Sequence, residues 1–368
     1  MQIQHLEVAN VRNLLSLQID PHPSVNFIIG ANGSGKTSLL EAISMLSRGR
    51  SFRTVQVKKV ISHGAPALTV FGSVLNGSGG VDRLGVRRGA DGEMLAKING
   101  SRCERLSDLA ALLPAVEVEA ASFEMLEGGP SVRRELLDWG LFHVEHAFLD
   151  VWKRFKSALD QKSALLRQGD SKSLRSSLSH WNQQLAVAGQ ALHVSRLHYV
   201  EMLSEAFSDV ARRYFGLEGV TLHYRPGWPD AANVDLASCL PQQAQTEIEQ
   251  GRPLYGPQKA DLAVLWNGQL ARDICSRGQK KLVIYGVRLA QVVLLHRLRH
   301  VAPVLLLDDL PAELDYTNIE KISMFLRDYP CQSFITAIDK DLGNGGLLHS
   351  FGDHRMFHVE HGQLTLSP

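Results

Sequence analysis

One run of eight residues predicts the chemistry of this chain most directly. It consists of Gly30, Ala31, Asn32, Gly33, Ser34, Gly35, Lys36 and Thr37, and it fits the phosphate-loop pattern Gly-x-x-x-x-Gly-Lys-Thr/Ser. Its three glycines let the backbone curl until successive N–H groups point inward at a polyphosphate. Lys36 is then placed to reach the β- and γ-phosphates as a catalytic cation, and the Thr37 hydroxyl to coordinate Mg²⁺. The loop therefore predicts binding of a nucleoside triphosphate.

A second candidate is the acidic pair Asp308-Asp309, which follows the apolar residues 304–307. Such a short apolar run predicts a buried strand, and ligands bind at the carboxyl ends of strands in α/β sheets. We expect Asp308 to complete the Mg²⁺ shell and Asp309 to act as the base for an attacking water. An Asp-Asp pair after a strand is equally typical of a plain turn, so the pair is interpreted together with its neighbours.

Two further motifs flank this pair. Ser276, Arg277, Gly278 and Gln279 come just before a long apolar helix pattern, where a hydroxyl and free N–H groups can bind an anion. Asp315 ends the segment Ala-Glu-Leu-Asp that follows the acidic pair. Both motifs also fit ordinary helix caps, so neither decides the function alone.

The elements that must position these residues can be read from the apolar spacing. Residues 25–29 form an apolar run typical of a buried strand, and the apolar positions after Lys36 fall at helical spacing. That strand–loop–helix order is the context that the phosphate loop requires. Alternation over residues 2–20 predicts an antiparallel strand pair, and residues 67–100 predict a β-meander with a glycine-rich turn at 76–80.

The middle of the chain is predicted to be helical. Apolar spacing continues from about residue 131 to 169 and again from 174 to 215, where Gly216 stops it. Two helices of roughly 35–40 residues would form an antiparallel arm about 50–60 Å long. The predicted domains are an N-terminal half of the head at 1–128, the helical arm at 129–216 and a C-terminal half of the head at 217–368. Beyond the arm, strands are expected at 220–224, 262–266 and 331–335, with helices at 244–250 and 319–326.

Charge is nearly balanced over the whole chain. The 368 residues carry a formal net charge of +1, so any DNA contact must come from local basic patches. Residues 131–175 hold nine Lys/Arg against six Asp/Glu, and Arg48, Arg50 and Arg53 cluster just after the predicted nucleotide site. Both groups are interpreted either as phosphate contacts or as solvated surface charge.

The cysteines and the apolar segments indicate the cellular compartment in which the protein is expected. Four cysteines are scattered without a Cys-x-x-Cys pair, which is typical of reduced thiols in a cytosol. No apolar stretch reaches the ~18 residues needed to span a membrane, and no export signal is visible, so a cytoplasmic protein without a membrane partner is expected. The sequence Phe-His-Val-Glu-His occurs at 142–146 and at 357–361. It is interpreted as coincidence rather than as a metal site, because neither copy has a further ligand nearby.

The order of the motifs resembles one architecture. Phosphate loop, helical insertion, Ser-Arg-Gly-Gln helix, Asp-Asp strand and Glu-Leu-Asp follow each other as in ABC-type ATPase heads of the SMC kind. Four longer segments are similar to the RecF family of bacterial DNA replication and repair proteins: Gly-Gly-Pro-Ser-Val-Arg-Arg (128–134), Leu-Asp-Trp-Gly (137–140), Tyr-Gly-Pro-Gln-Lys-Ala-Asp-Leu (255–262) and Asp-Asp-Leu-Pro-Ala-Glu-Leu-Asp (308–315). This resemblance covers essentially the whole chain. It implies an α/β fold, an ABC-type P-loop ATPase head with a mixed sheet plus an antiparallel β layer, and an inserted antiparallel helical arm.

The resemblance also implies a function. In such heads ATP with Mg²⁺ joins two subunits, because Ser276 and Gly278 of one reach the γ-phosphate held by the phosphate loop of the other. The resemblance also implies that Arg277, Gln279 and Asp315 contact the same nucleotide. The family implies an ATP-dependent homodimer that binds single-stranded and double-stranded DNA at junctions and gaps. With RecO and RecR it would help to load RecA, and so serve recombinational repair, replication restart and SOS induction.

Some positions depart from the patterns of these families. Ala120-Ala121 stand where the RecF family usually has Pro-Glu or Pro-Asp, so a carboxylate that senses metal and water is missing there. Gln258 replaces a His. Asp309 is one methylene shorter than the Glu of transporter heads, and Thr336 occupies the position of their switch His. These departures predict ATP binding with slow, DNA-stimulated hydrolysis.

Three other functions are compatible with a phosphate loop. The ATPase subunit of a transporter would share the loop, but the long arm and the Ser-Arg-Gly-Gln motif disfavour it. An SMC-like head of a nuclease complex would need a metal-ligand cluster, and the sequence shows none. A P-loop kinase would need a substrate lid, and nothing resembles one. The sequence therefore favours the repair ATPase.

Overall fold

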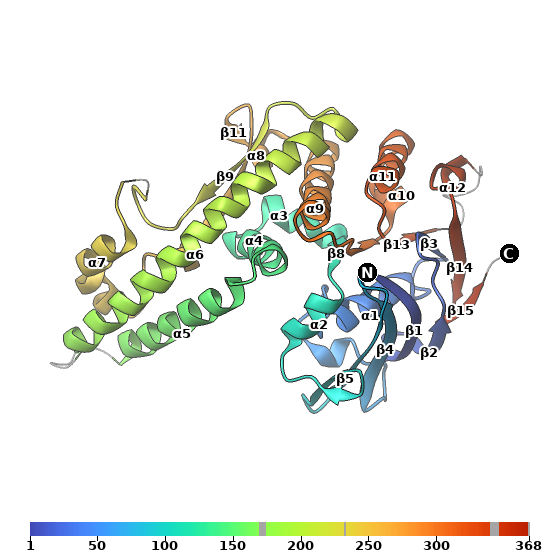
Figure 1. Cartoon of the computed structure of the whole chain (residues 1–368), viewed down its shortest axis with the longest axis horizontal. Helices are drawn as coiled ribbons and strands as arrows, with labels where there is room; N and C mark the ends of the chain where they lie inside the picture. Colours follow the sequence, from blue (N-terminus) through green and yellow to red (C-terminus); the bar gives the residue numbers. More distant parts are fainter. Residues whose placement is uncertain (169–173, 232, 339–345, 367–368) are drawn as a thin grey trace. The chain divides into compact units, whose positions relative to one another are not determined.

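The computed structural model describes residues 1–168, 174–231, 233–338 and 346–366, and the chain folds into two compact units (Figure 1). The first, here called the head unit, comprises residues 1–122, 210–216 and 277–368. The second, the arm unit, comprises residues 123–209 and 217–276. The arm unit is thus built from two insertions into the sequence of the head unit.

The phosphate loop and the acidic pair lie on a mixed six-stranded sheet of the head unit. Its order is β15-β14-β3-β13-β12-β8, in which β14 and β15 pair antiparallel and the other neighbours are parallel. The strands are β3 (Val25–Ile29), β8 (Ala115–Val118), β12 (Val304–Leu307), β13 (Ser333–Ala337), β14 (His354–Glu360) and β15 (Gln363–Leu366). Every residue of β3 and β12 is buried, as expected for strands covered on both faces. Because β3, β12, β13 and β8 are parallel, their carboxyl ends meet at one edge of the sheet.

A second, antiparallel sheet forms the other layer of the head unit. Its order is β2-β1-β4-β5-β6-β7. The strands are β1 (Gln2–Val11), β2 (Leu14–Ile19), β4 (Ala67–Leu75), β5 (Val81–Gly89), β6 (Met94–Ile98) and β7 (Ser101–Arg102). Helix α1 (Lys36–Arg48) contacts strands of both sheets, and its apolar side chains share one hydrophobic core with theirs. The predicted combination of a mixed sheet and an antiparallel layer is confirmed.

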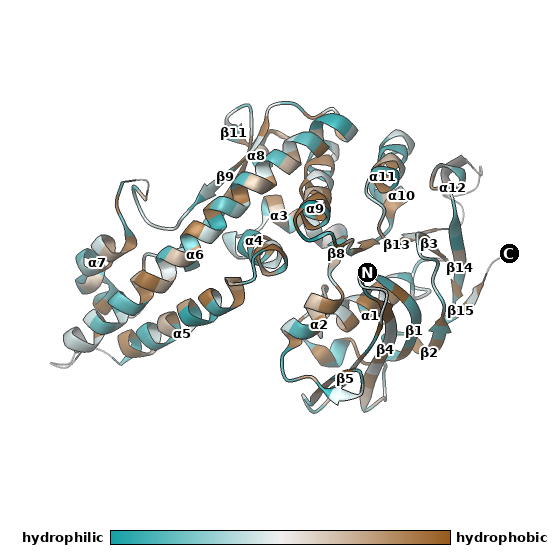
Figure 2. Ribbon diagram, in the orientation of Figure 1, coloured by the Kyte–Doolittle hydropathy of each residue, from teal (hydrophilic) through white to brown (hydrophobic). Residues whose placement is uncertain are grey.

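Helices complete the head unit. They are α2 (Leu106–Leu112), α9 (Arg277–Arg299), α10 (Leu310–Glu313), α11 (Tyr316–Asp328) and α12 (Gly346–Ser350), with short helical turns at Val57–Lys59 and Ala211–Phe215. A further helical turn, Ala120–Phe123, spans the boundary at which the chain passes to the arm unit. Helix α9 packs on β8, and hydrophobic residues are frequent along it in Figure 2. This helix begins with Arg277, Gly278 and Gln279 of the Ser-Arg-Gly-Gln motif, so these three residues rest on a firmly packed element.

The arm unit consists mainly of helices, with a small sheet of order β11-β10-β9. Its elements are α3 (Glu124–Glu127), α4 (Pro130–Val144), α5 (Phe148–Arg167), α6 (Leu174–Val210), α7 (Leu236–Gln250), α8 (Ala271–Ile274), β9 (Val220–Arg225), β10 (Asp261–Trp266) and β11 (Gln269–Leu270), and a helical turn at Pro257–Lys259. Helices α5 and α6 lie side by side, and residues of both line one shallow groove (Figure 1). The predicted antiparallel helical arm is therefore present.

The first arm helix is not continuous, which corrects the prediction of one helix from about 131 to 169. Helix α4 ends at Val144, Glu145 adopts an extended backbone (φ −115°, ψ 109°), and α5 begins at Phe148. Leu141 and Phe148 flank the break and are both buried. Their separation is close to two helical turns, so apolar spacing alone does not reveal the interruption. Helix α6 does run on as predicted, and Gly216 ends the helical segment with a left-handed backbone (φ 63°).

The compact units also differ from the predicted domain boundaries. Residues 217–276 belong to the arm unit, and not to a C-terminal half of the head that begins at 217. Strand β10 packs on α4, and Arg196 of α6 donates a hydrogen bond to the Pro257 carbonyl at 2.8 Å. Helix α7 begins at Leu236 rather than at 244, because the Asp235 side chain caps it. These contacts keep the segment with the arm helices.

The basic surplus of residues 131–175 is partly used inside the arm unit. The Arg133 guanidinium donates to both carboxylate oxygens of Asp261 at 2.6 and 3.1 Å. Lys162 contacts Glu247 at 2.7 Å, and both side chains are fully buried. The acidic partners lie outside the counted window, which explains part of the apparent excess. These cations are therefore not available to DNA.

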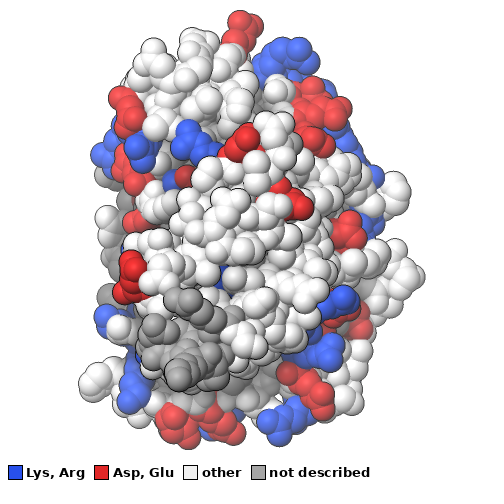
Figure 3. Space-filling view, turned by 90° about the vertical axis from the view of Figure 1, so that its left-hand side faces the viewer, with Lys and Arg blue, Asp and Glu red and all other residues white. Residues whose placement is uncertain are grey.

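Two stretches of the arm unit carry no charged side chain. Residues 176–195 of α6 and residues 236–246 of α7 contain no Lys, Arg, Asp or Glu. Figure 3 shows one face of the molecule with few charged side chains over its centre. Because cations bind phosphates, the uncharged stretches are not the surface expected to hold a DNA backbone.

Candidate nucleotide site

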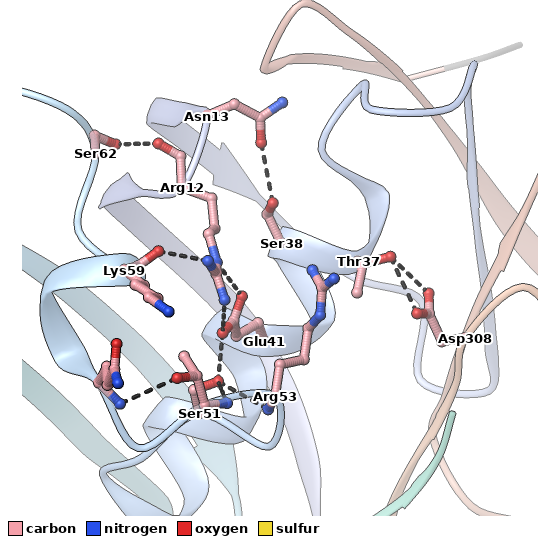
Figure 4. Close-up of polar contacts among 12 residues, drawn as sticks. Arg12, Asn13, Thr37, Ser38, Glu41, Ser51, Arg53, Lys59, Ser62 and Asp308 are labelled. Atoms are coloured by element: carbon pink, nitrogen blue, oxygen red, sulfur yellow. Dashed lines mark hydrogen bonds and ion pairs between the residues drawn. The ribbon is translucent and has the colours of Figure 1, made fainter. Parts of the chain in front are cut away.

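The phosphate loop joins the buried strand β3 to helix α1. Gly33 and Gly35 have positive φ angles of 79° and 123°, which other residues rarely adopt. Asn13, between β1 and β2, donates from Nδ2 to the carbonyls of Gly33 and Ser34 at 3.0 and 2.8 Å. Its Oδ1 accepts from the Ser38 hydroxyl at 3.0 Å (Figure 4). Asn13 thereby holds two loop carbonyls on its own side, which leaves the loop N–H groups to face the other way.

The inside of the loop is shaped for a ligand. A Cβ atom at Gly30 would lie 2.3 Å from the Val359 carbonyl oxygen and 2.6 Å from the Ser34 hydroxyl oxygen. The Ser34 hydroxyl is buried and has no hydrogen-bond partner among the residues that the structure describes. Buried hydroxyls are normally hydrogen-bonded, and a phosphate oxygen would supply the acceptor. The loop therefore fits the predicted nucleotide.

Lys36 and Thr37 open α1 at the edge of the mixed sheet. Lys36 is buried, and its Nζ donates to the carbonyls of Gly30 and Ala31 at 2.7 and 3.0 Å. The Thr37 Oγ1 lies 3.0 Å from each carboxylate oxygen of Asp308 (Figure 4). Oxygen ligands of this kind suit Mg²⁺. The two residues predicted to hold the metal ion are thus in contact, although 271 positions separate them in the sequence.

Thr336, at the end of β13, connects the two residues of the acidic pair. Its hydroxyl donates to Oδ1 of Asp308 at 2.7 Å and accepts from the backbone N–H of Asp309 at 2.6 Å. Asp309 has a left-handed backbone (φ 52°, ψ 42°), which is uncommon for a residue other than glycine. Strained backbone of this kind clusters at functional sites. Asp309 is therefore held next to the Thr37–Asp308 pair.

A buried carboxylate anchors the segment that follows α1. The side chain of Glu41 is fully buried and accepts hydrogen bonds from the Arg12 guanidinium at 2.8 and 2.9 Å. Glu41 also contacts the Ser51 hydroxyl, which in turn accepts from the backbone N–H groups of Arg53 and Thr54 at 2.9 and 3.2 Å (Figure 4). This network fixes the backbone from which Arg53 extends.

Two arginines of the basic cluster have different surroundings. Arg48 pairs with Glu117 at 2.7 Å, so its charge is neutralised within the head unit. Arg53 is exposed, and Figure 4 shows its side chain extended toward Thr37. Arg53 is thus placed to contact a phosphate, whereas Arg48 is engaged elsewhere.

Glu119 was not predicted as a site residue. It directly follows β8, and the Asp308 N–H donates to the Val118 carbonyl at 3.0 Å, so Glu119 and Asp308 leave neighbouring strand ends. Burial, followed by the negative charges of Glu117 and Asp308, raises the pKa of Glu119 to about 8. A carboxyl group is therefore present at this edge although Ala120-Ala121 supply none. Glu119 could have been recognised as an acidic residue directly after a strand, but the four-residue strand β8 was not predicted from the sequence.

The remaining predicted residues lie at helix starts. Ser276 directly precedes α9, which begins with Arg277, Gly278 and Gln279, and a Cβ atom at Gly278 would have no neighbour within 4 Å. Asp315 caps α11, where its carboxylate accepts from the Asn318 N–H at 2.9 Å. That hydrogen bond keeps the pKa of Asp315 below its ordinary value. The structure thus brings the phosphate loop, Thr37 and Asp308 together and places the other two motifs at helix N-termini.

The repeated Phe-His-Val-Glu-His segments lie in unlike surroundings. Residues 142–146 end α4 and enter the turn after it, whereas residues 357–361 lie in β14 and the turn that follows. Across the described ranges, no group of three or more His, Cys, Asp or Glu side chains could hold a metal ion. Within the same ranges, every helix is too short or too polar to cross a membrane.

Comparison with known proteins agrees with this geometry. The family model described as RecF/RecN/SMC N terminal domain matches residues 2–352. The DNA replication and repair protein RecF of Pseudomonas aeruginosa (strain LESB58) is 38% identical over 365 residues, which cover 99% of this chain and 98% of that protein. RecF of Azotobacter vinelandii is 39% identical over 367 residues, with 99% and 98% covered.

Solved structures show the same fold. The structure of the recombination mediator protein RecF with ATP, from the RecFOR pathway, has a TM-score of 0.86 at 23% identity and covers 100% of this chain and 98% of its own. An SMC head bound to the C-winged helix domain of ScpA has a TM-score of 0.57 at 16% identity and covers 100% and 97%. The predicted ABC-type ATPase head is therefore confirmed as the fold.

Proposed function

The chain belongs to the RecF family of DNA replication and repair proteins, and we propose on that basis that it is an ATP-dependent DNA-binding protein of recombinational repair and replication restart. One observation on the structure supports the proposal independently of membership in the family. The phosphate-loop Thr37 meets the strand-end Asp308 at 3.0 Å, as an ATPase site requires. Membership in the RecF family also disfavours the two alternative functions, the ATPase subunit of a transporter and the SMC-like head of a nuclease complex.

ATP with Mg²⁺ is the proposed cofactor. The N–H groups of residues 30–35 and the Lys36 ammonium bind the phosphates, and Thr37 and Asp308 hold the metal ion. Bound Mg²⁺ supplies positive charge to the phosphate oxygens. Arg53 adds a further cation from the loop after α1. The buried Ser34 hydroxyl and the Thr37–Asp308 contact support this assignment.

Slow turnover is proposed at the same site, stimulated by DNA. Asp309 accepts a proton from the attacking water, and Thr336 fixes the backbone of Asp309 through its hydroxyl. The Asp side chain is shorter than Glu and so reaches less far toward the water. Hydrolysis is therefore expected to be slower than nucleotide binding.

A second copy of the chain is proposed to complete the nucleotide site. Glycine in a helix is less favourable than alanine by about 1 kcal/mol, yet no neighbour within 4 Å of Gly278 requires it. A close approach from outside the chain explains the glycine. The Ser276 hydroxyl and the N–H groups at the start of α9 suit an anion such as the γ-phosphate. Arg277, Gln279 and Asp315 are assigned to the same nucleotide.

DNA and two proteins are the proposed partners. The curated relatives are named for DNA replication and repair, and the solved relative for the RecFOR pathway. By that likeness the ATP-bound homodimer binds single-strand/double-strand junctions or gapped DNA. It acts with RecO and RecR proteins in recombinase loading and supports SOS induction in the cytoplasm.

Sedimentation with ATP and with ADP tests the dimer. We expect ATP, but not ADP, to convert the wild-type monomer to a dimer, and Lys36→Arg and Ser276→Arg each to abolish the conversion while the monomer stays folded. Lys156→Arg is the matched control, because this exposed lysine of α5 pairs with Asp160 on its own helix. Normal dimers of both site variants would refute the residue assignments. A wild-type chain without an ATP-dependent dimer would refute the proposal.

Filter binding with gapped DNA tests the partner. We expect affinity that rises with ATP and falls steeply as salt increases, because phosphate contacts release counterions. Affinity that is absent, or that does not depend on ATP, would contradict the DNA-binding function.

A further inference from the structure

Helices α5 and α6 of the arm unit form a groove with a largely apolar lining. Trp181, Val187 and Ala191 line it from α6, and Val151 and Ala158 line it from α5. At 1.5 Å per residue, the α6 wall from Trp181 to Ala191 is about 15 Å long, close to three helical turns. The side chain of Val187 is 70% exposed. Covering it with another apolar surface would be favourable, because apolar area would leave water.

The exposed apolar surface continues along α6. Val194 and Leu197 are 56% and 41% exposed, and they follow Val187 by seven and ten residues, which keeps all three on one side of the helix. Val187 also lines a second groove, on the side of α6 that faces residues 235–237. Single exposed apolar side chains are ordinary, but a group of them on one side of a helix indicates a contact surface.

The α5 wall of the groove carries positive charge. Lys153 and Arg154 line the groove and are exposed. Lys156 pairs with Asp160 of the same helix at 2.7 Å, whereas neither Lys153 nor Arg154 has an ion-pair partner within the described part of the chain. The opposite wall is uncharged, because residues 176–195 contain no Lys, Arg, Asp or Glu. The groove therefore combines an apolar lining with two uncompensated cations on one side.

This combination selects among the possible occupants. A DNA strand needs cations along its phosphates, and here one wall offers none and is apolar instead. A second copy docked through the same face would bring Lys153 and Arg154 of both copies together, which like-charge repulsion opposes. A helix with an apolar face and an acidic flank satisfies both the apolar lining and the cations.

We propose that the α5–α6 groove binds an amphipathic helix of another protein, whose acidic side chains pair with Lys153 and Arg154. Apolar side chains that recur every three or four residues of that helix pack on Val187 and Trp181. The small side chain of Ala158 lets the bound helix approach α5 closely. The groove lies in the arm unit and uses no residue of the nucleotide site, so the binding is independent of the proposed function.

Fluorescence anisotropy with two labelled peptides tests the proposal on the full-length chain. Each peptide has about 18 residues and is held helical by a side-chain staple, because short free helices are marginal in water. Both carry leucine at the same helical spacing, and one flank is glutamate in the first peptide and lysine in the second. We expect the wild type to bind the glutamate peptide at least about tenfold more tightly, because opposite charges meet along α5.

A charge reversal locates the pairing. The Lys153→Glu/Arg154→Glu protein should prefer the lysine peptide. The matched control is Lys97→Glu/Arg102→Glu, which makes the same change of net charge at two exposed residues of β6 and β7 in the head unit. It should keep the wild-type preference. A role in folding alone would not reverse the choice between the two peptides.

A polar substitution tests the apolar part of the groove. Val187→Gln should weaken the binding of the glutamate peptide several-fold and leave the melting temperature unchanged, because the side chain is largely exposed and glutamine is a good helix former. Met324→Gln is the matched control, since Met324 is 49% exposed on α11 of the head unit. This control should bind the peptide as the wild type does.

Four outcomes would overturn the inference. The wild type could bind both peptides equally, or the charge reversal could leave the preference unchanged. Oligothymidylate binding that is lost in Lys153→Glu/Arg154→Glu and kept in Val187→Gln would make the groove a nucleic-acid surface. A wild type that self-associates without peptide, while Val187→Gln stays monomeric, would assign the groove to a second copy of the chain.

Discussion

Thr336 uses one hydroxyl to satisfy two groups of the acidic pair. The side chain is fully buried, donates to Asp308 and accepts from the Asp309 backbone. Thr336 is shorter than the histidine that transporter heads have at this position, and its hydroxyl is engaged at the strand end. The residue thus contributes to the geometry of the site through its neighbours.

Thr336→Val should destabilise the chain by roughly 1–3 kcal/mol, because it leaves the Asp309 N–H and the Asp308 carboxylate without this partner. Urea unfolding measures the loss. Thr336→Ser is the control that keeps the hydroxyl and removes one methyl group. A valine variant as stable as the serine variant would show that the two hydrogen bonds contribute nothing.

Single residues were predictable where a local motif fixes them. Lys36, Thr37 and Asp308 follow from short patterns, and the structure places Thr37 against Asp308. Asn13 and Glu119 were not found, because their importance depends on which distant segments pair with them. Asn13 matters only once its turn lies on the phosphate loop, and Glu119 only once β8 pairs with β12.

Helices α5 and α7 are joined by an ion pair that no solvent reaches. Lys162 and Glu247 are fully buried and 2.7 Å apart, and Glu247 also accepts from the Leu254 N–H at 2.8 Å. Burial lowers the pKa of Lys162, and the Glu247 charge acts in the opposite direction. Each charge is tolerated in the interior because the other is present.

Lys162→Met should destabilise the arm unit by roughly 3–5 kcal/mol, because it leaves the Glu247 charge buried and unpaired. Adding Glu247→Gln should restore most of the stability, since glutamine removes that charge and still accepts from Leu254. Chemical denaturation of the two single variants and the double variant checks this. A double variant no more stable than Lys162→Met would contradict the pairing argument.

Elements with long periodic patterns were predicted well. Helix α6 and the β-meander follow from apolar spacing over many residues. The break between α4 and α5 was missed because it preserves that spacing, and α2 and β8 are too short to give a pattern of their own. Helix α7 was predicted too short because Pro241 lies inside it.

The two compact units alternate along the sequence, so they cannot be found by cutting it into consecutive pieces. Residues 210–216 return to the head unit between two parts of the arm unit. Composition and spacing locate the helices of the arm, but the membership of residues 217–276 depends on contacts such as that of β10 with α4. The predicted boundary at 217 fails for this reason.

ATP and DNA should influence each other's binding equally in this chain. If ATP raises the affinity for gapped DNA by some factor, thermodynamic linkage requires gapped DNA to raise the affinity for ATP by the same factor, typically about 5–150-fold. Equilibrium titrations with a non-hydrolysable ATP analogue measure both factors. A factor of one in both titrations would show that the nucleotide does not control DNA binding.

Residues near the end of the chain form part of the wall of the phosphate loop. Strand β14 pairs with β3, and the Gly362 N–H donates to the Ser34 carbonyl at 3.1 Å. During translation, the ribosome releases the glycine-rich loop long before it releases residues 354–362. A nascent chain must therefore be almost fully synthesised before this part of the loop's wall can form. A premature stop codon shortly before residue 354 would yield a product that has Lys36, Asp308 and Asp309 but lacks a finished cradle.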